Sequence, residues 1–229
     1  PLFHTGGLNM YANPVLHQGG ELIIMREFNP SDALDAIDNT QLSITHLFGV
    51  PAPLQFMMQD KKFDLTNFDA LEVVGVGGAP CAEIIIKNWQ RKNVDVIQGW
   101  GMTETSPLAT ANLKTPDMEK LSKDEMYQLQ TKQGKPIYGV QLKIVDDDGN
   151  RLPEDGKAFG KLLIKGPWII KRYYKHDEDA VDVDGWFDTG DISTIDPDGY
   201  MTIVDRAKDV IKSGGEWISS VDLENAAVG

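Results

Sequence analysis

The stretch VDVIQGWGMTETSP at residues 94–107 decides the fold of this chain. Its first five residues are rich in valine and isoleucine, which predicts a short buried strand over residues 94–98. Glycines follow the end of this strand directly, and glycine lets a backbone approach a ligand closely. The stretch therefore predicts a sheet with a ligand-binding loop at one strand end.

Three side chains of this loop suit a nucleotide. Trp100 offers a flat face to a base, and the Thr103 hydroxyl can donate to a phosphate oxygen. The Glu104 carboxylate can hold Mg²⁺, a hard cation that prefers oxygen ligands and phosphate groups. A tight strand-to-loop turn around a buried tryptophan would explain the same residues, so the loop alone leaves both interpretations open.

Upstream of this loop, apolar runs alternate with helical patterns. We expect strands at residues 21–25, 43–48 and 71–76, and a helix over residues 82–91. Another helix is expected to start at residues 29–32, with Ser31 as its cap and Ala33, Leu34 and Ile37 on its apolar face. Alternating strands and helices predict a mostly parallel sheet.

Downstream of about residue 131 the pattern changes. Short apolar segments at residues 140–145, 160–166 and 200–204 are joined by Asp/Gly turns at residues 146–150 and 196–199. This pattern predicts an antiparallel barrel or roll. The acidic turns lack the spaced ligands of a calcium loop, so we interpret them as hairpin turns. Residues 114–133 are polar and predict a surface connection with a short helix.

Composition narrows the class of protein. The net charge of -13 argues against nucleic acid as the main partner, because phosphate backbones select basic surfaces. No apolar run reaches the roughly 20 residues of a membrane span. Cys81 is the only cysteine, and no signal peptide is visible, so we expect a cytoplasmic protein. The first residue is Pro1 and the last segment reads as a helix start, so both ends look cut from a longer chain.

The segment GVGGAP at residues 75–80 also begins like a dinucleotide fingerprint. It lacks the third glycine, and Pro80 replaces the required continuation. We therefore set a Rossmann site aside.

Five motifs in order carry a family resemblance: PLFH at residues 1–4, GGAP at 77–80, QGWGMTETSP at 98–107, GWFDTGD at 185–191 and DRAKDVIKSGGE at 205–216. Together they resemble the adenylate-forming superfamily of acyl-CoA synthetases, luciferases and peptide-synthetase adenylation domains, across essentially the whole chain. The resemblance implies nucleotide-binding residues, which are Gly77, Gly78, Ala79, Pro80, Gln98, Gly99, Trp100, Gly101, Met102, Thr103, Asp191 and Arg206.

The resemblance also implies roles for single residues. Asp191 would accept from both ribose hydroxyls, and Arg206 would reach the ribose or the α-phosphate. A turn-capping Asp and a surface ion pair are the structural alternatives. Thr103 and Glu104 would be catalytic, with Glu104 holding Mg²⁺. His4 would also be catalytic and would lie between the acyl pocket and the thiol entrance.

The same resemblance covers the C-terminal motif. Lys208 would be the hinge of a small lid domain, and Lys212 would contact the adenylate catalytically. Gly214, Gly215 and Trp217 would line the tunnel for coenzyme A. Two family parts are absent: the upstream Thr/Ser/Gly-rich phosphate loop and the lysine near the C-terminus that promotes adenylation. We therefore expect the chain alone to be inactive.

The predicted architecture is an α/β subdomain at residues 1–129, an antiparallel β-roll at 130–204, and a hinge with the beginning of a C-terminal lid domain at 205–229. The predicted function is that of an ATP-dependent acyl-CoA ligase fragment. The parent would use ATP, Mg²⁺ and coenzyme A to activate a medium- or long-chain fatty acid through acyl-AMP. Ligases for methylthiopropionate or aryl acids, a peptide-synthetase adenylation domain, and an AMP-binding fragment without turnover remain alternatives. The sequence also leaves a homo-oligomer open.

Overall fold

The computed structural model describes residues 2–207, 211–213 and 216–218. The chain divides into two compact units, Pro1–Lys132 and Gln133–Gly229, and each is described by itself. No helix in the described part is both long enough and apolar enough to cross a membrane.

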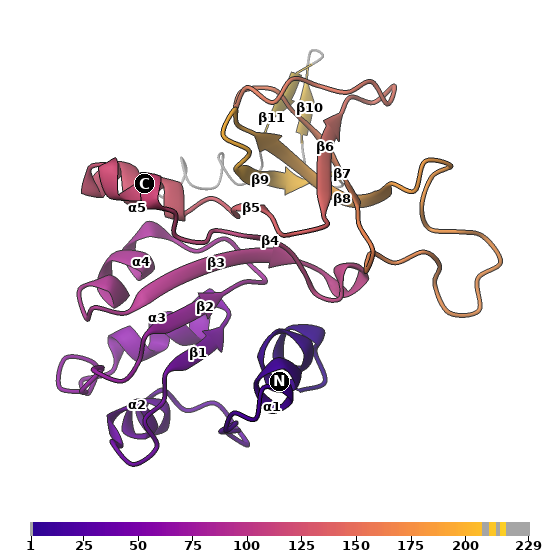
Figure 1. The fold of residues 1–229 in the computed structure, drawn as a ribbon. Helices are drawn as coiled ribbons and strands as arrows, with labels where there is room; N and C mark the ends of the chain where they lie inside the picture. The colour runs from indigo at the N-terminus through magenta and orange to yellow at the C-terminus, as the bar shows by residue number, and fades with distance from the viewer. Residues whose placement is uncertain (1, 208–210, 214–215, 219–229) are drawn as a thin grey trace. The chain divides into compact units, whose positions relative to one another are not determined.

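The first unit contains a predominantly parallel sheet (Figure 1). Its strands run in the order β1 (His46–Gly49), β2 (Val73–Val76), β3 (Asp95–Gly101) and β4 (Leu108–Ala111). β2 pairs in parallel with both β1 and β3, whereas β4 is antiparallel to β3. Parallel neighbours need a crossover, and helices supply it. The mostly parallel sheet predicted from the alternating pattern is confirmed.

The helices of the first unit are a π-helical segment Gly6–Ala12, α1 (Asn13–His17), α2 (Pro30–Asp38), α3 (Pro51–Gln59), α4 (Glu83–Gln90) and α5 (Lys123–Gln130), with 3₁₀ turns at Thr103–Thr105 and Pro116–Lys120. The core lies between α2–α4 and the sheet. Trp89 on α4 is fully buried, and the rings of Phe63 and Phe68 meet it edge-on at 5.2 and 5.6 Å. Such edge-to-face contacts are the favoured geometry for aromatic pairs.

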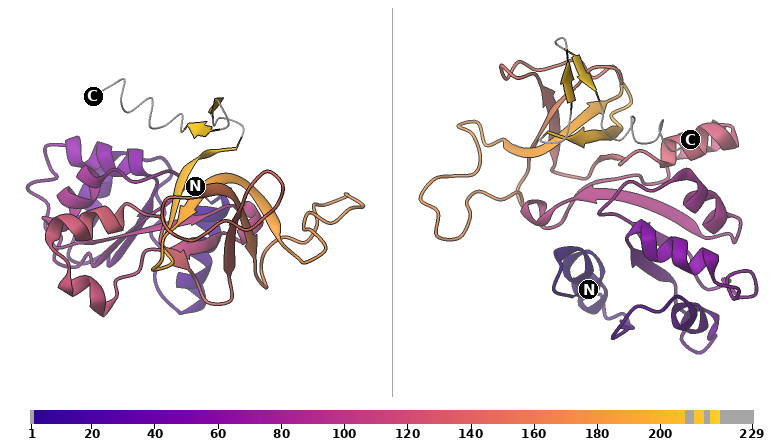
Figure 2. Two further views of the ribbon diagram at one scale, coloured as in Figure 1. Left: turned by 90° about the horizontal axis from the view of Figure 1, so that it is seen from above. Right: turned by 180° about the vertical axis from the view of Figure 1, so that it is seen from behind.

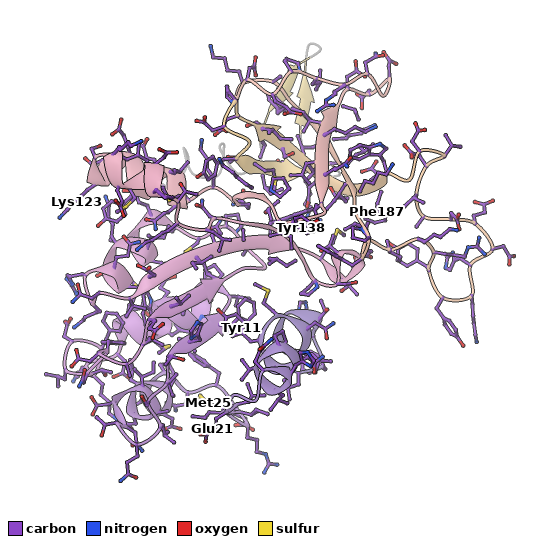
Figure 3. The ribbon with its side chains drawn as sticks, in the orientation of Figure 1. Tyr11, Glu21, Met25, Lys123, Tyr138 and Phe187 are labelled. Carbon is purple, nitrogen blue, oxygen red and sulfur yellow. The ribbon has the colours of Figure 1, made fainter. Side chains whose placement is uncertain are left out.

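Two local predictions in this unit are wrong. Residues 21–25 form no strand, and Met25 is 37% exposed on an irregular segment ahead of α2 (Figure 3). Apolar residues form a strand only when a neighbour pairs with their backbone, and this segment pairs with no described strand. The cap of α2 is Asn29, not Ser31, because the Asn29 side chain accepts from the Asp32 N–H at 3.1 Å. Ala33, Leu34 and Ile37 are buried as predicted.

The second unit begins with the two-residue strand β5 (Lys135–Pro136). An antiparallel sheet follows, which Figure 2 draws from two further sides. Its strands run in the order β6 (Gln141–Val145), β7 (Phe159–Lys165), β8 (Phe187–Ile195) and β9 (Met201–Arg206). This confirms the predicted change from parallel to antiparallel structure. β10 (Ile211–Ser213) and β11 (Glu216–Ile218) pair in the antiparallel direction.

In the acidic turns of this unit, aspartate side chains accept hydrogen bonds from backbone N–H groups. Asp146 Oδ1 accepts from the N–H groups of Asp148 and Asn150, at 2.9 and 2.8 Å. The bonds from the Asn150 side chain and backbone lower the pKa of the Asp146 carboxyl. Asp196 accepts in the same way from Asp198 and Tyr200. These carboxylates therefore stabilise hairpin turns, as the sequence indicated.

Candidate functional site

The two glycine-rich loops of the first unit begin at the same edge of its sheet. Residues 77–80 follow β2 and residues 102–107 follow β3, and these strands are parallel, with Val76 paired to Gln98. The carboxyl ends of neighbouring parallel strands form the edge at which open α/β sheets bind ligands.

Glycine allows the loop after β2 to pass close to β3. A Cβ on Gly77 would lie 3.1 Å from the carbonyl oxygen of Gly99, which belongs to the backbone of β3. Gly78 has φ of +80°, a conformation that other residues rarely adopt. The loop after β2 thus lies close to β3, and the approach of these glycines to a ligand stays a prediction.

Thr105 organises the loop after β3, and sequence reasoning missed it. Thr105 is fully buried, and its hydroxyl accepts from the Met102 N–H at 2.8 Å and also contacts the Pro107 carbonyl. These bonds fold residues 103–105 into a 3₁₀ turn. A hydroxyl three residues after a loop start was the available signal, because Ser and Thr often bond to nearby backbone.

The predicted ligand-contacting side chains of this loop are accessible to different extents. Thr103 is exposed, whereas Trp100, Met102 and Glu104 are half-buried. Gln98 differs from all of them, because its side chain is buried and hydrogen-bonded to Cys81 and Thr131. The assignment of these residues to nucleotide binding remains a prediction.

His4 lies near the start of the chain, before the π-helical segment. Its side chain is exposed, and Nδ1 accepts from the Gly6 N–H at 3.0 Å. From the same region, Tyr11 reaches toward the sheet and stacks on Phe48 of β1, with ring centroids 5.5 Å apart (Figure 3). Burial raises the pKa of the Tyr11 phenol. The role of His4 beside an acyl pocket stays a prediction.

In the second unit, Asp191 and Arg206 face each other across β8 and β9. The Asp191 side chain is almost completely buried, and its Oδ1 lies 2.7 Å from Nη1 of the more exposed Arg206. Upstream, the Thr189 hydroxyl donates to the Leu162 carbonyl at 2.9 Å and accepts from the Asp191 N–H at 3.1 Å. The strand pairing, the ion pair and Thr189 therefore hold Asp191 in one position.

The remaining predicted residues lie in the C-terminal motif. Lys208, Gly214 and Gly215 lie outside the described residues. Lys212 and Trp217 are paired between β10 and β11, which places only their backbones. The first unit thus brings together Gly77, Gly78, Gly99 and the loop to Pro107, and the second brings together Asp191 and Arg206. Convergence of the two groups on one cleft stays a prediction.

The fold and loops define the class: a mixed α/β protein with glycine-rich loops at the ends of parallel strands, followed by an antiparallel unit. The profile of the AMP-binding enzyme family matches residues 1–174. The chain belongs to this family.

Curated relatives match over the whole chain. It is 42% identical over 231 residues to a 3-methylmercaptopropionyl-CoA ligase of Ruegeria lacuscaerulensis, and 43% identical over 235 residues to a medium-chain-fatty-acid–CoA ligase of Ectopseudomonas oleovorans. In both comparisons the match covers 100% of this chain but only 42% of the relative. The chain therefore spans less than half the length of these ligases.

A solved structure shares the fold. An O-succinylbenzoate coenzyme A synthetase from Bacillus subtilis, in complex with ATP and magnesium ion, superposes with a TM-score of 0.81 at 27% identity. The match covers 100% of this chain and 45% of that protein.

Proposed function

We propose that this chain is the nucleotide-binding part of a longer ATP-dependent acyl-CoA ligase. Membership of the AMP-binding enzyme family and the CoA ligases among its relatives support this proposal. The parent protein would join a carboxylic acid to AMP with release of pyrophosphate. It would then transfer the acyl group to the thiol of coenzyme A and release AMP.

The observation that carries the proposal is the pair of loops at the ends of β2 and β3. The loop after β2 passes close to Gly99 of β3, since a Cβ on Gly77 would lie 3.1 Å from the Gly99 carbonyl oxygen, and Thr103 and Trp100 remain accessible. An adenylate needs a flat apolar slot for its base and donors for its phosphate. Residues 77–80 and Trp100 would form the slot, and Thr103 would donate to the phosphate.

Glu104 fits a magnesium site of the kind that nucleotides bring with them. The described residues include no cluster of three or more His, Cys, Asp or Glu that could bind a metal alone. Mg²⁺ is commonly held by one or two carboxylates together with phosphate oxygens and water, so a single half-buried Glu suits it. When bound with ATP, the ion would neutralise phosphate charge as pyrophosphate leaves.

Asp191 would bind the ribose. A carboxylate has about four acceptor sites, and Asp191 already pairs with Arg206. In the proposal the same carboxylate would also accept from the ribose hydroxyls. Arg206 is more than half exposed, so its other donors can reach the α-phosphate. His4, Lys208, Lys212, Gly214, Gly215 and Trp217 keep the acyl, hinge and coenzyme A roles given above as part of the proposal.

Two acids are the leading substrates. The similarity to the medium-chain ligase supports a fatty acid as the substrate. The similarity to the 3-methylmercaptopropionyl-CoA ligase, at nearly the same identity, supports a short thioether acid. The test is thioester formation by a longer protein that contains this chain, with octanoate, palmitate, 3-methylmercaptopropionate and benzoate supplied separately. Preference for octanoate or palmitate would support the fatty-acid proposal. Preference for 3-methylmercaptopropionate would replace it, and no thioester from any acid would refute the ligase proposal.

The isolated chain should bind nucleotide without completing the reaction. AMP binding and acyl-AMP formation, measured side by side on the 229-residue chain, separate these properties. Binding without acyl-AMP is the expected result. Robust turnover by the chain alone would contradict the expectation that essential groups lie in the rest of the parent.

A further inference from the structure

We infer that Gln98 is a positioning residue, which fixes the loop after β2 to strand β3 and does not itself contact the nucleotide. The functional part of this inference rests on the proposed AMP site. Its structural part can be tested without any nucleotide.

Gln98 lies in the middle of β3, beside the end of β2. It is on β3, opposite Val76, the last residue of β2, and directly before the glycine-rich stretch. Only 1% of the residue is exposed. A buried polar side chain needs partners, and the identity of those partners shows what the side chain does.

Both ends of the Gln98 amide are occupied by backbone groups. Oε1 accepts from the Cys81 N–H at 3.0 Å, and Nε2 donates to the Thr131 carbonyl at 3.0 Å. A backbone N–H can only donate and a carbonyl can only accept, so these partners define the orientation of the amide. Aspartate, glutamate and leucine each lack one or both of the groups required here. The side chain is thus committed to the fold and has no described contact with an exposed surface.

The Cys81 bond closes the loop that the proposal assigns to adenine. Pairing of β2 with β3 holds the start of residues 77–80, and the bond to Gln98 holds their end. Between these points, Gly77 already approaches the Gly99 carbonyl. A four-residue loop held at both ends has few conformations, so its shape is prepared before a ligand arrives. This is preorganisation, which reduces the entropy lost on binding.

Asn112 provides a matched control in the same region. Its backbone N–H donates to the Gln98 carbonyl at 2.8 Å. Its side-chain Nδ2 donates to the carbonyls of Leu129 and Lys132, at 2.6 and 2.9 Å, and it is 2% exposed. The Asn112 side chain therefore anchors the end of α5, as the Nε2 of Gln98 does, but it has no contact with Cys81.

The experiment compares Gln98→Met, Gln98→Glu and Asn112→Leu in the 229-residue chain. Far-UV circular dichroism establishes that each variant folds. Amide hydrogen exchange by NMR then reports on the Cys81 N–H, and isothermal titration calorimetry with AMP reports on binding. Gln98→Glu keeps an oxygen for the Cys81 N–H but loses the amide donor to Thr131, so it separates the two bonds.

We expect Gln98→Met to expose the Cys81 amide to faster exchange and to weaken AMP binding about tenfold, the effect of losing roughly one hydrogen bond. Gln98→Glu should preserve more of the Cys81 protection than Gln98→Met, and AMP affinity should follow that protection. Asn112→Leu should lower the melting temperature comparably, while AMP binding and the Cys81 amide change by less than twofold.

Three results would overturn the inference. Unchanged Cys81 exchange in Gln98→Met would show that the bond does not hold the loop. Equal loss of AMP affinity in Gln98→Met and Asn112→Leu would reduce Gln98 to general stability. Normal AMP affinity despite faster Cys81 exchange would remove its positioning role. If wild type binds no AMP, the proposed function of the chain fails, and the Cys81 exchange still decides whether Gln98 holds the loop after β2.

Discussion

Replacement of Gly101 by alanine should distort the loop that carries Thr103 and Glu104. A Cβ at this position would overlap the Pro107 carbonyl, lying 2.8 Å from its carbon and 2.9 Å from Thr105 Oγ1. Ordinary carbon contacts begin at about 3.5 Å, so the backbone must move by roughly 0.7 Å or more. No side-chain rotation can relieve a clash with a carbonyl. The movement would also strain the bond between the Thr105 hydroxyl and the Met102 N–H.

The free energy of unfolding should fall by about 2–4 kcal/mol in Gly101→Ala. Overpacking contributes roughly 1–3 kcal/mol, and one weakened hydrogen bond adds about 1 kcal/mol. For a chain of this size the melting temperature should drop by about 4–16 °C. Misplacement of catalytic groups by about 1 Å can cost roughly 100-fold in rate. The rate of adenylation by the parent should therefore fall by more than the loss of folded protein alone would cause.

Gly49→Ala is the control for this substitution. The nearest atom to a Cβ on Gly49 is Cδ2 of Leu54 at 3.7 Å, an ordinary contact with a side chain. Its unfolding free energy should stay within about 1 kcal/mol of wild type. Urea unfolding followed by circular dichroism measures both variants. A loss below about 0.5 kcal/mol in Gly101→Ala would refute the reasoning from space, as would equal losses in the two variants.

Three further predictions follow from single side chains. Glu104→Gln in the parent should slow pyrophosphate release at least tenfold while shifting the melting temperature by less than 3 °C, and unchanged release at saturating Mg²⁺ would exclude a metal role. Asp191→Asn should weaken AMP binding about tenfold by calorimetry, because the ribose loses a charged acceptor; equal affinity would remove Asp191 from the site. Burial raises the pKa of the Cys81 thiol to about 12, so a thiol reagent at pH 8 should label the unfolded chain far faster than the folded one. The unfolded thiol loses its proton at a lower pH than the folded one. The contribution of this group to the free energy of unfolding should therefore be complete below about pH 8.5 and fall as pH rises toward 12. In urea titrations, a contribution from Cys81 that increases with pH, relative to Cys81→Ala, would contradict the burial.

Much of the architecture was predictable because burial of one face of a strand or helix makes apolar residues recur at a regular spacing in the sequence. The alternation at residues 140–145 and the glycines and aspartates of the following turn predicted β6 and its hairpin correctly. The helix over residues 82–91 was equally clear, and α4 spans Glu83–Gln90. In these segments local propensity and tertiary packing favour the same structure.

The missed elements are those in which local residue propensity and tertiary packing favour different conformations. β8 (Phe187–Ile195) was not predicted, because Asp188, Gly190 and Asp191 are typical turn residues. Pairing on both sides, with β7 and β9, overrides that tendency. α3 (Pro51–Gln59) was not predicted, because proline is typical both of strand ends and of the first position of a helix.

The sequence indicated which motifs make up the candidate site. It did not indicate which side chains of a motif bond to the rest of the fold and which are accessible to a ligand. Gln98 and Thr103 belong to one motif, yet Gln98 is buried and Thr103 is exposed. Which side chain bonds to the fold depends on distant partners, here Cys81 and Thr131, and spacing within the motif carries no information about them. The physical difference between holding a loop and contacting a ligand becomes visible only in three dimensions.

The most direct test of the central claim is acid-dependent exchange of labelled pyrophosphate into ATP. The measurement uses a longer protein that contains this chain, and it follows the adenylation step without coenzyme A. The account predicts exchange that requires a carboxylic acid and Mg²⁺ and that falls at least tenfold in Gly101→Ala, whose loop is displaced. A folded, ATP-binding parent that shows no exchange with fatty, thioether or aryl acids would contradict the account.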